Sequence, residues 1–142
     1  MLKRALISSL LLIGASSTAL AHGGTSKSPE QAKVYFIEPL DGQTVSSDFT
    51  VKFGLSGMGV SPAGIEKKNT GHHHLLIDGK KLPDMHKPLP ATKHIKHFGG
   101  GQTETTLSLA PGKHTLQLLL GNYAHVPHDK AVLSKKITIT VK

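Results

Sequence analysis

The clearest strand pattern in the chain is the stretch Phe49-Thr50-Val51-Lys52-Phe53-Gly54-Leu55, in which large apolar residues alternate with polar or small ones. Successive side chains of a β-strand point to opposite faces, so this period of two predicts a strand with one buried face. No stretch shows the sustained 3.6-residue periodicity of an amphipathic helix. The fold is therefore predicted to be all-β, built outward from this strand.

Shorter runs of the same kind lie on both sides of this stretch, separated by glycine, proline, asparagine and aspartate, which favour turns. About six to eight short strands in one domain predict an immunoglobulin-like β-sandwich. Further strands are predicted at 33–38, 72–78, 102–109, 113–120 and 132–141, with room for one short edge strand within 80–101. The predicted apolar faces include Val51, Phe53, Leu55, Leu76, Leu116, Leu118, Ile137 and Ile139.

The N-terminus has the three parts of a secretory signal peptide: the cations Lys3 and Arg4, an apolar run over 5–13, and the small-x-small site Ala19-Leu20-Ala21. The apolar run is too short for a membrane anchor, which needs about 20 residues. We therefore expect residues 1–21 to be cleaved, leaving no membrane span. Residues 22–32 are then predicted to form a flexible N-terminal arm, and 33–142 a single sandwich domain in the periplasm or outside the cell.

The composition excludes several kinds of chemistry. The chain has no cysteine, so neither disulfides nor thiolate metal sites can form. The formal net charge is +8, but the lysines are scattered and the only arginine is Arg4, within the predicted signal peptide. Binding to nucleic acid requires clustered cations together with aromatic side chains that stack on bases, so we expect no nucleic-acid partner.

The chain has ten histidines, all of them after residue 21. If successive strands alternate in direction, the strands beginning at 72 and 102 and the loop after 120 meet at one end of the sandwich. Neutral imidazole is the commonest protein ligand of copper and zinc, so the sequence predicts one metal-binding region there. The predicted ligands are His72, His74, His97, His125 and His128.

Three other histidines are predicted to orient these ligands or to replace one of them: His73, His94 and His22. His73 alternates to the face opposite its two neighbours, so a packed or hydrogen-bonded core position is expected for it. Cleavage after Ala21 would leave His22 first, and its amino group and ring could together chelate Cu(II) as a histidine brace. His114 is expected to lie far from the metal.

Glycines and further blocks of sequence accompany the histidines. The run Gly99-Gly100-Gly101 is predicted to let backbone approach the site closely. Six blocks are similar to the bacterial periplasmic family catalogued as domain of unknown function 4399, and the resemblance implies an exported single-domain protein without an established activity. The blocks are 34–39, 53–58, 71–78, 97–104, 111–116 and 125–128.

A sandwich with an N-terminal histidine is also similar to periplasmic copper carriers. This chain departs from them, because Lys27, Pro29 and Gln31 stand where the carriers have a compact His-rich strand. The analogy concerns layout alone and implies no activity.

Three functions fit these patterns. The first is a periplasmic protein that binds copper or zinc for buffering or delivery, in contact with a protein partner. The alternative is an envelope interaction module that binds a protein or an anionic polymer without metal. An enzyme is less favoured, because a hydrolytic zinc site usually needs a carboxylate base, and Glu66 and Glu104 lie in no recognisable motif.

Overall fold

The computed structural model describes residues 24–142, which form nine strands and no helix. The predicted signal peptide and His22 lie outside the described residues. The strands are β1 (Lys33–Glu38), β2 (Thr44–Val45), β3 (Asp48–Ser56), β4 (Gly59–Val60), β5 (Thr70–Ile77), β6 (Ile95–His97), β7 (Glu104–Ser108), β8 (Gly112–Gly121) and β9 (Ile137–Val141).

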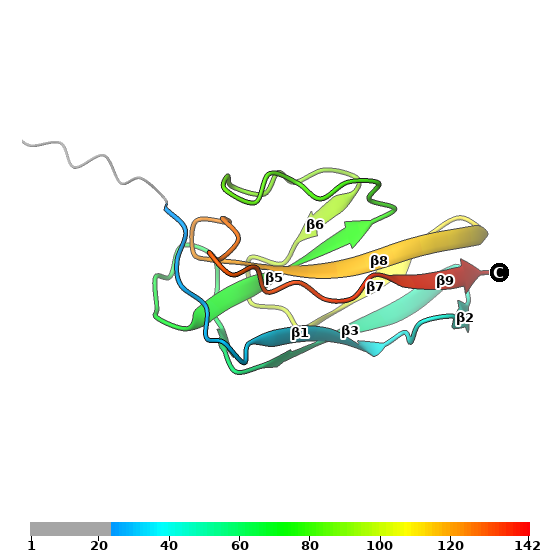
Figure 1. Cartoon of the computed structure of the whole chain (residues 1–142). Coiled ribbons are helices and arrows are strands. Elements are labelled where there is room, and N and C mark those ends of the chain that lie inside the picture. Colours follow the sequence, from blue (N-terminus) through cyan, green and yellow to red (C-terminus); the bar gives the residue numbers. More distant parts are fainter. Residues whose placement is uncertain (1–23) are drawn as a thin grey trace, which may run out of the picture.

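The strands form two layers, so the predicted all-β sandwich is confirmed (Figure 1). One layer is a three-stranded sheet in the order β1-β3-β7. The other is a six-stranded sheet in the order β2-β9-β8-β5-β4, in which β6 also pairs with β5. β6 is the short edge strand predicted within 80–101. The two-residue strands β2 and β4 were not predicted, because two residues are too few to show alternation.

The last strand is shorter than predicted, beginning at Ile137 rather than at 132. Ser134 explains the difference, because its side chain enters the ladder beside β8. The Ser134 hydroxyl accepts a hydrogen bond from the Leu118 amide, and the Gln117 amide side chain donates to the Ser134 carbonyl, both at 2.9 Å. Backbone bonds also join this segment to β8, but the pairing there is limited to an isolated bridge between Leu119 and Leu133, and the regular ladder starts at β9.

The main core lies between the sheets and contains most of the predicted apolar residues, with Leu55 partly buried at its border. Leu76 is the exception, since it packs with Leu89 and Leu119 in a separate cluster. The reason is the alternation within β5. Leu75 and Ile77 point into the main core, so Leu76 points to the opposite face of the six-stranded sheet, which we call the outer face.

The described part of the predicted arm is fastened to the loop between β8 and β9. The Asn122 side chain donates to the Gly24 carbonyl at 3.1 Å, and the Asp129 amide donates to the Ser26 carbonyl at 3.0 Å. The Ser28 hydroxyl donates to the Lys130 carbonyl at 2.7 Å. Figure 1 shows this segment passing the loop before it enters β1. The arm therefore lies along the loop that carries His125.

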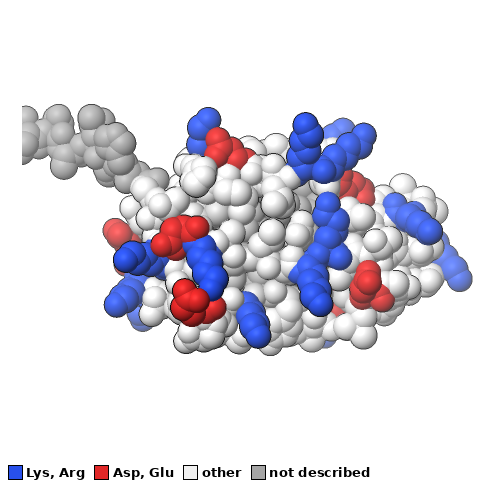
Figure 2. Space-filling view, in the orientation of Figure 1, with Lys and Arg blue, Asp and Glu red and all other residues white. Residues whose placement is uncertain are grey.

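Charged side chains are mixed over the surface. Figure 2 shows lysines spread across the visible face, with acidic residues among them. Exposed ion pairs join Lys52 to Glu38 and Lys87 to Asp84. Within residues 24–142, no helix has the length and apolar character needed to cross a membrane.

Candidate metal centre

Four imidazole rings converge on the outer face of the six-stranded sheet, and we call them the histidine cluster. They belong to His72 and His74 on β5, His97 on β6 and His125 in the loop after β8. Each histidine offers one ring nitrogen to this group, and these four nitrogens all lie within 4.8 Å of one another. Four nitrogens bound tetrahedrally to zinc at about 2.0–2.1 Å would be about 3.4 Å apart. The cluster is therefore close to the size that one ion requires.

Strand register brings three of the four rings together. His72 and His74 are two residues apart on β5, so their side chains share the outer face. Antiparallel pairing sets His97 of β6 directly opposite His74, and the two rings stack with centroids 5.1 Å apart. The Nε2 atom of His97 lies 3.2 Å from the Nε2 atom of His72. The spacing of these rings thus follows from regular β-sheet geometry.

His125 reaches the cluster through a turn held by Asn122. The Asn122 carboxamide oxygen accepts hydrogen bonds from the Ala124 and Val126 amides, at 2.9 and 3.0 Å. His125 has a left-handed backbone with φ of 65°, an uncommon conformation for a residue with a side chain. Its Nδ1 atom lies 3.1 Å from the Nε2 atom of His72. The turn therefore holds a strained residue with its ring on the cluster.

Two glycines leave room for the rings. A Cβ atom on Gly121 would lie 2.6 Å from Cε1 of His74, and one on Gly99 would lie 2.4 Å from Cε1 of His97. Both distances are below ordinary van der Waals contact, so any larger residue would displace a ring. The predicted close approach of backbone at the glycine run is thus observed at Gly99. The role of Gly121 was not predicted, because the sequence does not show which residue lies opposite a glycine on the neighbouring strand.

Three of the four rings, those of His72, His74 and His97, are held in their neutral form. Burial, followed by the neighbouring histidines His125 and His97, lowers the pKa of His72 to about 4. Burial and the same kind of neighbours lower the pKa of His74 to about 3. Burial also lowers the pKa of His97, with His125 contributing. Metal binding requires unprotonated imidazole, so these rings are ready to bind at neutral pH.

The buried rings also carry unused polar atoms. His72 and His74 are fully buried, yet Nδ1 of His72 and both ring nitrogens of His74 have no hydrogen-bond partner among the described residues. Buried polar groups are paired in the great majority of proteins, so each exception calls for an explanation. A bound metal ion would supply a partner for one nitrogen of His74. In His72 it would bind Nε2, which faces His97 and His125, and would leave Nδ1 as it is.

His73 and His128 lie outside the cluster. His73 points into the main core, as predicted from alternation, where its ring lies 5.1 Å from that of Phe53. His128 was predicted as a ligand from its place in the same loop as His125. It is buried, but its Nε2 atom lies 3.3 Å from the Thr70 carbonyl, and its ring does not join the four. The turn at Asn122 places the His125 ring against His72, while the His128 ring contacts the first residue of β5 instead.

The remaining described histidines are separate from the cluster as well. His94 Nδ1 lies 2.9 Å from the Ile77 carbonyl at the far end of β5. His114, expected to be remote, lies near the start of β8, with Nδ1 at 2.7 Å from Asp78 Oδ2. This hydrogen bond raises the pKa of His114. His86 is exposed in the loop before β6.

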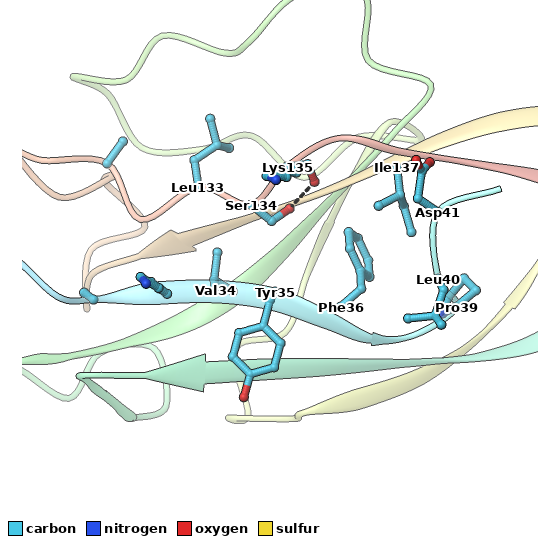
Figure 3. A pocket seen from close by; sticks show the side chains of 13 residues that line it. Val34, Tyr35, Phe36, Pro39, Leu40, Asp41, Leu133, Ser134, Lys135 and Ile137 are labelled. Atoms are coloured by element: carbon cyan, nitrogen blue, oxygen red, sulfur yellow. Dashed lines mark hydrogen bonds between the residues drawn. The ribbon is translucent and has the colours of Figure 1, made fainter. Parts of the chain in front are cut away.

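A groove with a volume of about 550 Å³ lies elsewhere on the described chain. It runs between β1 and the irregular segment before β9, with Val34 and Phe36 on one side and Leu133 and Ile137 on the other (Figure 3). None of the four clustered histidines lines it. The walls are mainly apolar, and the lining also includes Lys33, Asp41, Ser134 and Lys135.

Comparisons with known proteins bear on family membership and not on activity. A family model described as "Domain of unknown function (DUF4399)" matches residues 51–142. An X-ray structure of the endo-beta-1,4-mannanase from Thermotoga petrophila is similar with a TM-score of 0.46 and 16% sequence identity. That match covers 79% of this chain and 20% of the mannanase chain. No curated protein matches the sequence.

Proposed function

This chain belongs to the domain of unknown function 4399 family, and because that family has no assigned activity, we propose from the histidine cluster that the protein binds one copper or zinc ion. The observation that carries the proposal is the convergence of four imidazoles from three separate segments within 4.8 Å. The His72 and His74 rings are fully buried, and neither nitrogen of His74 has a hydrogen-bond partner within residues 24–142. A single ion would join all four.

The donor set selects among metals. The cluster contains imidazole nitrogens and no carboxylate. Calcium and magnesium require oxygen ligands, and iron sites more often include a carboxylate, so these ions fit poorly. Copper(II) and zinc(II) both bind well to nitrogen, in tetragonal and tetrahedral arrangements respectively. The same ligands therefore serve either ion, and spectroscopy of the bound metal distinguishes them.

The biological role we propose is buffering or delivery of this ion in the periplasm. The signal-peptide pattern of residues 1–21 supports an exported protein. The position of the cluster supports reversible loading, because His97 is exposed and His125 is half-buried while His72 and His74 form a buried floor. An ion can therefore be reached from solvent through one side. A periplasmic protein that accepts the ion would complete the role.

Titration of untagged, metal-free protein tests the proposal. Calorimetry with Cu(II) and with Zn(II) should show one site per chain, and His72→Ala should weaken binding by at least about tenfold. His86→Ala is the matched control, since it removes an exposed histidine outside the cluster and should leave binding unchanged. Equal losses in the two variants would indicate scattered surface binding. Absence of stoichiometric binding would favour the metal-free interaction module instead.

A further inference from the structure

The site has no negative charge of its own. All four donors are imidazoles, which are neutral when they bind metal. A divalent ion held by them alone would keep its full charge of about +2 at a partly buried position. Uncompensated charge in such surroundings is costly, so an anion close to the ion would be strongly favoured.

No carboxylate of the described chain is placed to compensate this charge. The acidic residues are engaged away from the cluster, by salt bridges in some cases and by hydroxyl or amide hydrogen bonds in others. The pairs are Glu30 with Lys130, Glu38 with Lys52, Asp84 with Lys87, Asp78 with His114, Asp48 with Ser108, Asp41 with the Thr138 amide, and Asp129 with the Ser28 amide. Glu66 lines a different pocket, and Glu104 begins β7 in the other sheet.

The cluster is buried on the β5 side and exposed at His97. His72 and His74 are fully buried, and the backbone of Gly121 lies against the ring of His74. His97 is exposed, on a three-residue strand at the edge of the sheet. An ion at the centre of the four rings is therefore shielded on the β5 side and faces solvent beside His97. An ion held by the four rings could take a further ligand from solution through this side.

We infer that the bound ion keeps one exchangeable coordination position beside His97, and that this position takes a small anionic donor from solution. The inference rests on the proposed metal binding and names its further ligand class: a monovalent anion such as a carboxylate or azide. The anion forms one bond to the metal by displacing water, and no electrons are transferred. A protein that accepts the ion can bind it at the same position when the ion is transferred.

Azide is the probe for this position, because it binds open sites on copper(II) and produces a charge-transfer absorption band. Untagged protein loaded with one equivalent of Cu(II) is titrated with sodium azide and followed by visible absorption and electron paramagnetic resonance. We expect one new saturable band that corresponds to one azide per copper, and formate should compete with it. His86→Ala, which changes an exposed histidine outside the cluster, should give the same titration.

A pair of charge reversals locates the position. Lys96 is exposed and adjacent to His97, whereas Lys113 is exposed near the opposite end of β8. At low salt, Lys96→Glu should weaken azide binding by roughly threefold through repulsion, and Lys113→Glu should leave it unchanged. Equal effects of both variants would overturn the placement beside His97.

The outcomes separate this inference from the proposed function. If copper binds one to one but its spectra stay unchanged in excess azide, the ion is fully enclosed and the inference is wrong while metal binding stands. If neither Cu(II) nor Zn(II) binds stoichiometrically, the proposed function fails, and the exchangeable position fails with it.

Discussion

Gly121→Ala offers a sharp test of the cluster because it changes no histidine. Gly121 ends β8 and pairs with His72 across the sheet. An added Cβ would lie 2.6 Å from Cε1 and 3.1 Å from Nδ1 of His74. The His74 ring would have to move by roughly 0.8 Å to restore ordinary contact. It has little room, since the His72 and His97 rings lie 4.7 and 5.1 Å away, centroid to centroid.

The size of the effect follows from this crowding. Overpacking a buried site costs typically about 1–3 kcal/mol, and we expect the free energy of unfolding of metal-free protein to fall within that range. Ligand distances in metal sites hold to within about 0.2 Å, so a displaced His74 ring would no longer be positioned to bind. Changes that misplace a metal-binding histidine usually cost about 10–100-fold in affinity, and we expect a loss of that order here.

Urea unfolding of metal-free protein and competition titration with a chelating indicator measure the two effects. Gly79→Ala is the matched control, because its added Cβ would meet nothing closer than the Lys81 carbonyl at 3.8 Å. The control should change neither quantity appreciably. If Gly121→Ala bound metal as tightly as the unchanged protein, the close packing of His74 against Gly121 would have no part in metal binding, and the reasoning would be refuted.

Three further predictions follow from the described residues. In metal-free protein, burial lowers the pKa of His72 and of His73 to about 4 and that of His74 to about 3. These folded-state pKa values lie below the unfolded value of about 6.5. The free energy of unfolding should therefore be highest above pH 6.5 and should fall as the pH drops toward 4. For His73 alone the loss should reach up to roughly 3 kcal/mol. Urea unfolding at pH 7 and 4.5 measures this loss, and His73→Leu should reduce it; equal losses in both proteins would contradict the assignment. The hydrogen bond to Asp78 raises the pKa of His114, so its stabilisation is present below about pH 6.5 and is lost as the pH rises through the folded-state pKa. His114→Gln should therefore lower the unfolding free energy at pH 5.5 by about 0.5–1 kcal/mol, a modest value because the Asp78 side chain is 39% exposed, and by less at pH 8.5; an equal effect at both pH values would argue against an ion pair. Asn122→Ala leaves the Ala124 and Val126 amides without their acceptor and should cost about 2–3 kcal/mol in urea unfolding. Because that turn positions His125, metal affinity should fall by about tenfold as well, and unchanged affinity in the competition assay would show that His125 is not a ligand.

Local backbone geometry determined much of what the sequence predicted. Alternation at residues 49–55 marks β3, and turn residues mark the ends of the other long strands. The same period of two separates His73, which packs on Phe53, from His72 and His74 on the outer face. These features depend on neighbours one or two positions away, so they can be predicted from the chain alone.

Contacts between residues far apart in the sequence decided the features that were not predicted. His125 meets His72 across 53 positions only because Asn122 holds a left-handed turn, and the same turn leaves His128 on the Thr70 carbonyl. Ser134 delays the start of β9 through bonds to β8. Gly121 makes space for a ring on the neighbouring strand. The sequence by itself determined which residues face which side of each strand, because that property is local. Which loop side chains meet over the outer face was decided by the tertiary structure, because it depends on strand register and on hydrogen bonds that close long loops.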